Sequence, residues 1–199
     1  MNRISDKAVN MIKQFEGCVL HAYKCTPNEQ YYTIGYGHYG LTNPNVTIDE
    51  ATAEHFLRDD LQRFEDHVNE IDEKYGYDFT QNEFDALVSF AFNIGGINQL
   101  TQDGARSKAS IAGHMTAYCT DGVNKLDGLV ARREKEQYLF MHGVYPDGET
   151  LYSDRALLSE DDTIAKLIDD ICNGIYGNGD KRKELLFDTI QDLVNRRYQ

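Results

Sequence analysis

The sequence predicts an α+β fold, in which a mainly helical domain carries a small antiparallel hairpin sheet and precedes a C-terminal three-helix module. Apolar residues recur at helical spacing along most of the chain. Residues 20–39 instead alternate aromatic and β-branched residues with glycine, which is typical of strands. Residues 144–159 contain proline, glycine and aspartate without a sustained period. We therefore expect a domain over residues 1–146, a linker over 147–160 and the module over 161–199.

Charge and composition exclude several classes of function. The formal net charge is −13, whereas nucleic-acid binding requires a basic face, so no nucleic-acid partner is expected. No apolar run approaches the length of a membrane span, and residues 1–17 lack the apolar region of a signal peptide. We expect synthesis in the cytoplasm and, for any action outside, release by another factor. The four cysteines show no metal-ligand spacing, so free thiols and no metal or cofactor are expected.

The first predicted helix places one acid beside the predicted sheet. Ser5 is a good N-cap and Gly17 a good C-cap, so Glu16 falls in the last turn. The helix dipole disfavours a negative charge there, which favours the protonated form that a general acid needs. A solvated glutamate at a helix end is the alternative and the commoner case. The apolar face of this helix comprises Ile4, Ala8, Met11, Ile12 and Phe15.

The segment after Gly17 predicts a hairpin that faces this acid. CTPNEQ has the composition of a turn, and YYTIGYGH reads as strand with close backbone approaches at its glycines. The fold-back brings the Cys25 thiol and the Thr33 hydroxyl towards Glu16. An acid facing a polar, tyrosine-rich hairpin indicates acid catalysis on a carbohydrate.

Two capping boxes predict the next two helices. Thr47 and Glu50 form the first, which starts a long helix that ends near Gly76. Thr80 and Glu83 form the second. The helix that follows is apolar nearly all round, so we expect it to be central and buried.

The remaining elements of the domain are shorter. Asn93 and Gly95 are expected to close the central helix. Residues 97–110 read as loop leading into a helix start, and residues 111–119 as a short helix. A last helix is predicted over residues 129–141, followed by a good C-cap sequence.

Several ordered blocks resemble the phage-type lysozymes of glycoside hydrolase family 24, the endolysins with an N-acetylmuramidase fold. The blocks are FEGCVLHAY, YYTIGYGHYG, TQNEFDALVSFAFNIG and GLVARREKEQYLFMHGVY, and the resemblance covers residues 4–145. It implies a lysozyme-like muramidase domain. That family uses a glutamate, an aspartate or cysteine nine positions on, and a threonine at the start of the TIGYGH run. These fall on Glu16, Cys25 and Thr33, and the gap between the last two is two residues longer than usual.

Cysteine in place of aspartate leaves three roles open for residue 25. Cys25 positions a water together with Thr33, acts as a thiolate, or is inert. Water positioning is favoured because nothing basic adjoins the cysteine in sequence. His38 is a candidate base, but a structural histidine that locks the hairpin is the favoured interpretation.

The resemblance also indicates residues of a substrate site. Arg132 and Arg133 in the last helix are candidate partners of the catalytic acid, the alternative being exposed arginines on a solvated face. Asn93 and Gly95 end the central helix where such relatives bind glycan. Tyr36 is a candidate for the cleft wall, although a tyrosine in a sheet more often packs in the core or at the rim.

The C-terminal stretch ICNGIYGNGDKRKELL resembles a single CW-seven type cell-wall-binding repeat, a three-helix module that binds muropeptide. Glycines expose backbone N–H groups, tyrosine offers a stacking face, and arginine offers a fork for a peptide carboxylate. An appendage that only packs on the enzyme is the alternative. The implied binding turn comprises Gly174, Tyr176, Gly177, Asn178, Gly179 and Arg182.

These features together predict a monomeric endolysin. It would hydrolyse the β-1,4 bond between N-acetylmuramic acid and N-acetylglucosamine in bacterial peptidoglycan, with glycan strands and muropeptide as its partners. Made in the host cytoplasm, it would act on the cell wall after release. One alternative is a catalytically inactive peptidoglycan-binding protein, in which cysteine for aspartate marks lost activity. Another is a lytic transglycosylase, or a hydrolase of related polymers such as chitin.

Overall fold

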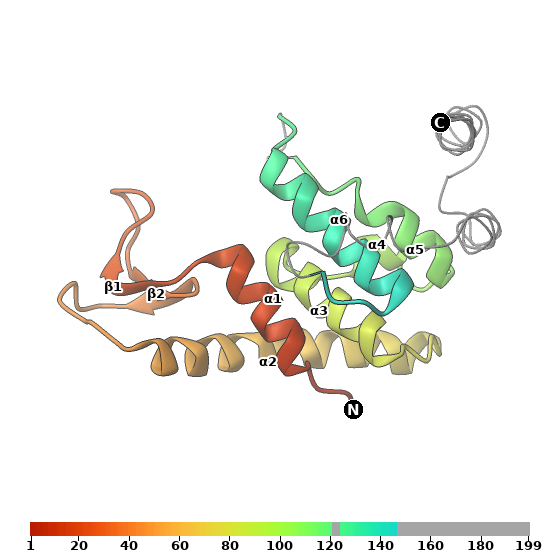
Figure 1. Ribbon diagram of the computed structural model, residues 1–199, viewed down its shortest axis with the longest axis horizontal. Helices are drawn as coiled ribbons and strands as arrows, with labels where there is room; N and C mark the ends of the chain where they lie inside the picture. The colour runs from red at the N-terminus through yellow and green to blue at the C-terminus, as the bar shows by residue number, and fades with distance from the viewer. Residues whose placement is uncertain (121–123, 147–199) are drawn as a thin grey trace, which may run out of the picture.

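The computed structural model describes residues 1–120 and 124–146, and Figure 1 shows a small sheet at one end and a group of helices at the other. The long helix α2 runs beneath both parts. Helix α1 lies between them and is joined to α2 by ion pairs. The expected linker over residues 147–160 and the module over 161–199 lie outside the described residues.

Within these ranges the fold has six helices and one three-stranded antiparallel sheet. The helices are α1 (Asp6–Glu16), α2 (Glu50–Tyr75), α3 (Gln81–Ile94), α4 (Asn98–Thr101), α5 (Lys108–Met115) and α6 (Asp127–His142). The strands are β1 (Val19–Tyr23), β2 (Tyr32–Gly35) and β3 (His38–Leu41), and they follow one another in the sheet. The predicted α+β class, mainly helical with a small hairpin sheet, is confirmed for this domain.

The segment predicted as one continuous strand forms two strands, β2 and β3, in the structure. Tyr23 of β1 lies opposite Thr33 of β2, so the segment between them makes the expected connection. A turn that contains Gly37 (φ 96°) then separates β2 from β3, which corrects the expectation of a single strand. A Cβ added at Gly35 would lie 3.0 Å from the Cβ of Ala53 in α2. This glycine therefore permits the close approach of the sheet to the long helix.

Helix α1 begins and ends as predicted. The side chain of Ser5 accepts a hydrogen bond from the N–H of Ala8, which satisfies one free donor of the first turn. Gly17 has φ 67°, and its N–H donates to the carbonyl of Lys13. Glu16 is therefore the last residue of the helix, directly before β1.

The start of α2 corrects the predicted capping box. Asp49, not Thr47, is the N-cap, and its carboxylate accepts from the N–H of Thr52 at 2.8 Å. Thr47 instead pairs with His21 in an antiparallel bridge beside β1, so its backbone belongs to the sheet side of the connection. The end of the helix is as expected, because Gly76 adopts the left-handed conformation that suits a C-cap.

Helix α3 is the buried centre of the domain, as predicted. Thr80 and Glu83 form the expected reciprocal capping box. Gly95 closes the helix in the left-handed conformation with φ 98°. Fully buried side chains include Phe84, Leu87 and Phe90, and α3 packs against α1, α2 and α6. No helix in the described part of the chain is both long and apolar enough to cross a membrane.

The last three helices differ from prediction at their ends. Helix α4 is a single short turn in a segment expected to be loop, and its polar sequence gives no periodic signal. Helix α5 starts behind Ser107, whose hydroxyl accepts from the N–H of Ser110, and it ends at Met115 rather than at residue 119. Helix α6 begins at Asp127, two residues before the predicted start, within the usual uncertainty of helix boundaries.

Candidate active site

Glu16 is the acid around which the candidate site is built. The residue as a whole is exposed at the end of α1, but its side chain is only 24% exposed. Nη1 of Arg132, from α6, donates to Oε1 of Glu16 at 2.6 Å. An adjacent guanidinium stabilises a carboxylate, so it opposes the effect expected from the helix end.

Glu16 borders a cavity of about 350 Å³ between the sheet and the helices. Tyr36 and Asn93, two of the predicted substrate residues, also line it. The full lining comprises Glu16, Tyr36, Gly37, Tyr39, Asp60, Arg63, Phe92 and Asn93. Residues from α1, the β2–β3 hairpin, α2 and α3 thus meet at one concave, largely polar site.

Tyr36 serves the core as well as the cavity. The residue is 5% exposed, and its hydroxyl donates to Oε1 of Glu50 at 3.1 Å. Burial, together with this carboxylate, raises the pKa of Tyr36 to about 12. The hydroxyl is therefore protonated at neutral pH and committed to a partner at the start of α2.

The predicted groups on the hairpin have different environments. Thr33 is buried in β2, with 6% exposure. Cys25 is exposed beyond the end of β1, where its backbone N–H donates to the carboxylate of Glu29 at 2.9 Å. The thiol is thus open to solvent, whereas the threonine lies inside the sheet.

Tyr23 is a site residue that sequence reasoning missed. Burial raises the pKa of its hydroxyl, and the neighbouring Cys25, Glu29 and Glu16 add to this rise. Tyr23 is the last residue of β1 and lies opposite Thr33 in the ladder. One signal was present in the sequence, where Tyr23 precedes Cys25 by only two residues.

Arg132 and Arg133 are buried, so the alternative of exposed arginines is wrong. Arg133 is completely inaccessible, and its guanidinium carbon lies 4.6 Å from the ring centroid of Phe90. Nε of Arg132 donates to Oε1 of Glu136 at 3.1 Å, and Nε of Arg133 lies 3.0 Å from Oε2. The second contact is electrostatic rather than a well-aligned hydrogen bond.

Arg133 connects this buried cluster to the cavity. Its Nη2 donates to the side-chain oxygen of Asn93 at 3.1 Å, and Asn93 lines the cavity. Burial lowers the pKa of Arg133 and raises the pKa of Glu136, while their mutual attraction opposes both shifts. Gly95 contributes the turn that ends α3 two residues after Asn93.

His38 has the contacts of a structural histidine. Its Nδ1 lies 2.9 Å from Oδ2 of Asp60 in α2, and its ring stacks on Phe56 at a centroid distance of 4.5 Å. The histidine thereby ties β3 to α2 beside the cavity. This geometry supports the favoured interpretation over a catalytic base.

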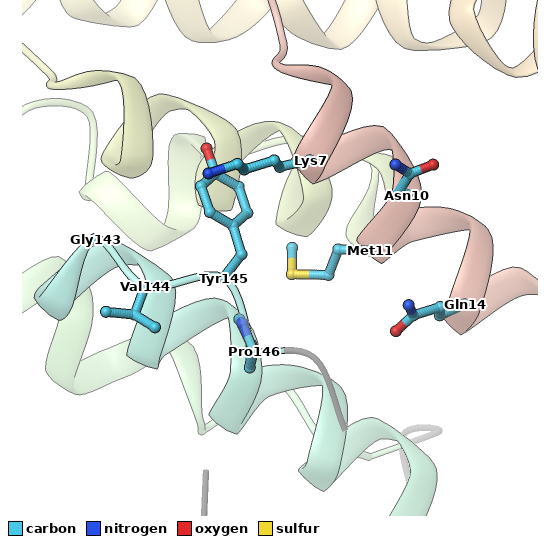
Figure 2. Close-up of a pocket in the computed structure, with 8 residues that line it drawn as sticks. All are labelled: Lys7, Asn10, Met11, Gln14, Gly143, Val144, Tyr145 and Pro146. Carbon is cyan, nitrogen blue, oxygen red and sulfur yellow. The ribbon is translucent and has the colours of Figure 1, made fainter. Parts of the chain in front are cut away.

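A second, larger cavity of about 540 Å³ lies between α1 and the segment after α6 (Figure 2). Lys7, Asn10 and Gln14 of α1 line one side, Val144 and Tyr145 line the other, and Lys7 extends over the ring of Tyr145. It includes none of the predicted catalytic residues, so its size does not make it the active site. The predicted wall-binding residues Gly174, Tyr176, Gly177, Asn178, Gly179 and Arg182 lie outside the described residues.

Known proteins are similar to this chain in sequence. The chain is 45% identical to the endolysin of Bacillus phage B103 over a 148-residue alignment that covers 70% of this chain and 54% of that protein. It is 33% identical to the endolysin of Acyrthosiphon pisum secondary endosymbiont phage 1, covering 69% of this chain and 97% of that protein. The chain thus spans about half the length of the Bacillus phage relative.

Solved structures give the same result. The muramidase domain of SpmX from Asticaccaulis excentricus superposes with a TM-score of 0.62 at 31% identity, covering 71% of this chain and 99% of that one. The endolysin from Escherichia coli O157:H7 phage FAHEc1 gives 0.61 at 31% identity, covering 73% and 98%. Residues 13–136, which include Glu16 and Arg132, match the phage lysozyme family. The chain therefore belongs to the phage lysozyme family and has its lysozyme-like fold.

Proposed function

We propose that this chain is an endolysin that hydrolyses the β-1,4 bond between N-acetylmuramic acid and N-acetylglucosamine in bacterial peptidoglycan. The observation that carries this proposal is Glu16, a partly buried acid that lines a polar cavity inside the family-matched segment. We also assign the chain to glycoside hydrolase family 24, as a monomer that acts on the wall after release.

Glu16 is the proton donor in this mechanism. A sugar that fills the cavity displaces water, which disfavours the carboxylate and favours the protonated acid. Glu16 then gives its proton to the glycosidic oxygen as the bond from this oxygen to the sugar carbon breaks. Arg132 stabilises the carboxylate that forms, because its guanidinium is already 2.6 Å away. Solvent returns a proton to Glu16 after the product leaves.

In this proposal, side chains of the hairpin act on the face of the sugar ring opposite the leaving oxygen. Cys25 and Thr33 position the water that attacks the sugar carbon. The water adds its oxygen to that carbon and releases one proton to solvent. A water that attacks from the face opposite the leaving oxygen inverts the configuration of the sugar.

Clearing of purified cell walls tests the proposal. Wild-type protein should reduce turbidity, and Glu16→Gln should lower the rate by about a thousandfold or more, because the amide has no proton to give at the required acidity. Glu70→Gln, an exposed glutamate on α2, is the matched control and should clear walls at the wild-type rate. Substantial clearing by Glu16→Gln would remove Glu16 from the acid role.

Two readouts separate the alternatives. Wild-type protein that pellets with walls but does not clear them would be a peptidoglycan-binding protein without activity. Mass spectrometry of the soluble products identifies the reaction, since a muramidase leaves reducing ends and a lytic transglycosylase leaves 1,6-anhydro ends. Chitin in place of wall material tests the related-polymer alternative in the same assay.

We further propose that residues 161–199 form a CW-seven type module that binds muropeptide, joined to the enzyme by residues 147–160. Its support is the glycine and arginine spacing of ICNGIYGNGDKRKELL. Backbone N–H groups exposed at the glycines and a guanidinium fork suit a peptide carboxylate. A tyrosine within the same turn offers a stacking face.

A further inference from the structure

We propose that Glu136 is a positioning residue for the reaction: its buried carboxylate fixes Arg132 against Glu16 and, through Arg133, fixes Asn93 at the cavity wall. This inference rests on the proposed muramidase function. Glu136 lines neither the cavity nor the hairpin, and it is fully buried in α6. Its effect on the reaction is therefore transmitted by the two arginines.

The guanidinium of Arg132 is held on every edge. Nη1 donates to Glu16 at 2.6 Å, Nε to Glu136 at 3.1 Å, and Nη2 to the carbonyl of Ser89 at 3.2 Å. Its carbon also lies 4.9 Å from the ring centroid of Phe15, one residue before the acid. Within the part of the chain that the structure describes, Glu136 is the one charged group that anchors Arg132 on the side away from Glu16.

The carboxylate of Glu136 is itself fixed. The hydroxyl of Ser89 in α3 donates to Oε1 at 2.7 Å, a buried bond between two helices. Nη2 of Arg133 lies 3.3 Å from the same oxygen and also donates to Asn93 at 3.1 Å. One carboxylate thus orients two arginines, one directed to the acid and one to a residue that lines the cavity.

Charge balance makes this arrangement functional as well as structural. Glu16 and Glu136 compensate Arg132 and Arg133, so the cluster is neutral when all four groups are ionised. Loss of the Glu136 charge would leave two buried cations near a single carboxylate. Their field would hold Glu16 in its ionised form, which cannot donate a proton.

Other titratable or charged groups lie near Glu16 or the arginine cluster, and the variant leaves them in place. Tyr23 in β1 lies close enough to Glu16 to feel its charge. Asp60 and Arg63 in α2 line the cavity with Glu16. Cys119 lies near Arg133. A change in the pH profile on substitution of Glu136 therefore reports the arginine cluster.

The test compares Glu136→Gln with wild type in the full-length chain. The readouts are kcat and KM for a soluble peptidoglycan oligosaccharide across the pH range. We expect kcat to fall about 10–100-fold, as for loss of a supporting residue around a functional group. The alkaline limb of the kcat/KM profile should move to lower pH by about half to one unit, because Glu16 is harder to protonate.

Two further variants make the test specific. Glu134→Gln removes the same charge from an exposed position of the same helix, and it should leave kcat and the pH limb unchanged. Glu136→Asp keeps the charge on a shorter side chain, so it should lower kcat while the limb stays at the wild-type pH. This variant also serves where Glu136→Gln does not fold.

A measurement without substrate separates this inference from the proposed function. The Nε–H signal of Arg132 in nitrogen-15 spectra should exchange slowly in wild type and rapidly in Glu136→Gln. Slow exchange in both, or an unmoved pH limb with activity that falls only as folded protein is lost, would make Glu136 purely structural. Failure of wild type to cleave peptidoglycan would instead overturn the proposed function and leave the exchange result standing.

Discussion

The ion pair of Glu16 and Arg132 resolves two opposing requirements on a single side chain. A general acid must be protonated before reaction and must tolerate a negative charge after it. The end of α1 disfavours the charge, and the guanidinium at 2.6 Å favours it. In the proposed mechanism, a bound sugar excludes solvent from the cavity, which would shift the balance towards the form that donates.

Substitution of Cys25 tests how the attacking water is positioned in the proposed mechanism. Asp at this position offers a carboxylate that orders water more strongly than a thiol, whose hydrogen bonds are weak. Cys25→Asp should therefore retain or raise the wall-clearing rate if the thiol only orders water. Cys18→Asp, which places the same charge at an exposed cysteine before the other end of β1, should give no gain. Complete loss of clearing in Cys25→Asp alone would indicate a step that requires the thiol.

Individual residues differ in how far the sequence could place them. The pairing of Glu16 with an arginine of the last helix followed from the family resemblance, and Arg132 makes that contact. Glu136 stands three and four positions after the two arginines, which is the spacing of helical ion pairs. Burial decides its importance, and burial depends on how α6 packs against α3. The sequence pattern of α6 carries little information about that face.

At the scale of elements, α1 is held to α2 by ion pairs along its length. Nζ of Lys13 lies 2.9 Å from Oε2 of Glu54, and Arg58 bridges Glu54 to Asp6 at the start of α1. A hydrogen bond from Lys13 is the largest cause of a lowered pKa at Glu54, followed by one from Arg58. These contacts fix the helix that carries Glu16.

This arrangement predicts a pH-dependent contribution to stability. The pKa of Glu54 is lower in the folded state, so its contribution is complete above the unfolded value of 4.5 and is lost as pH falls through the folded value. Because the side chain is 32% exposed, we expect only about 0.5–1 kcal/mol. Urea unfolding should show Glu54→Gln less stable than wild type by this amount at pH 7 and equal to it near pH 3.

Glu73→Gln, exposed on the same helix, controls for loss of a negative charge from an acidic protein. Its stability in urea unfolding should match or slightly exceed that of wild type at pH 7. It should not show the stability deficit at pH 7 that disappears on acidification in Glu54→Gln. A Glu54→Gln deficit that persists unchanged at low pH would mean that packing rather than charge holds α1 to α2 at this point.

Elements whose ends depend on local chemistry were predicted well. Ser5, Gly17 and the capping box at Thr80 act within one helical turn, so their sequence neighbours suffice. The start of α2 was predicted wrongly, because two residues that are good N-caps, Thr47 and Asp49, lie two positions apart. Thr47 is taken by its bridge to β1, a contact 26 residues away in sequence, and Asp49 is left to cap the helix.

At the scale of the whole molecule, the net charge of −13 constrains how the protein reaches its substrate. An acidic protein gains no electrostatic attraction towards an anionic wall polymer. The proposed wall-binding module would supply the missing affinity, since a tethered enzyme experiences a raised local concentration of substrate. The proposed module at residues 161–199 would therefore determine the rate on insoluble walls but not the chemistry.

Arg182→Ala separates these two contributions. The substitution removes the guanidinium proposed to bind a peptide carboxylate, so the wall-bound fraction in pelleting assays should fall about tenfold. Clearing of walls at low protein concentration should slow in proportion, while kcat on a soluble oligosaccharide stays at the wild-type value. Arg197→Ala, outside the ICNGIYGNGDKRKELL signature, should change neither quantity. Equal losses on walls and on the soluble substrate would show that the segment supports the enzyme domain itself, and the separate wall-binding role would be abandoned.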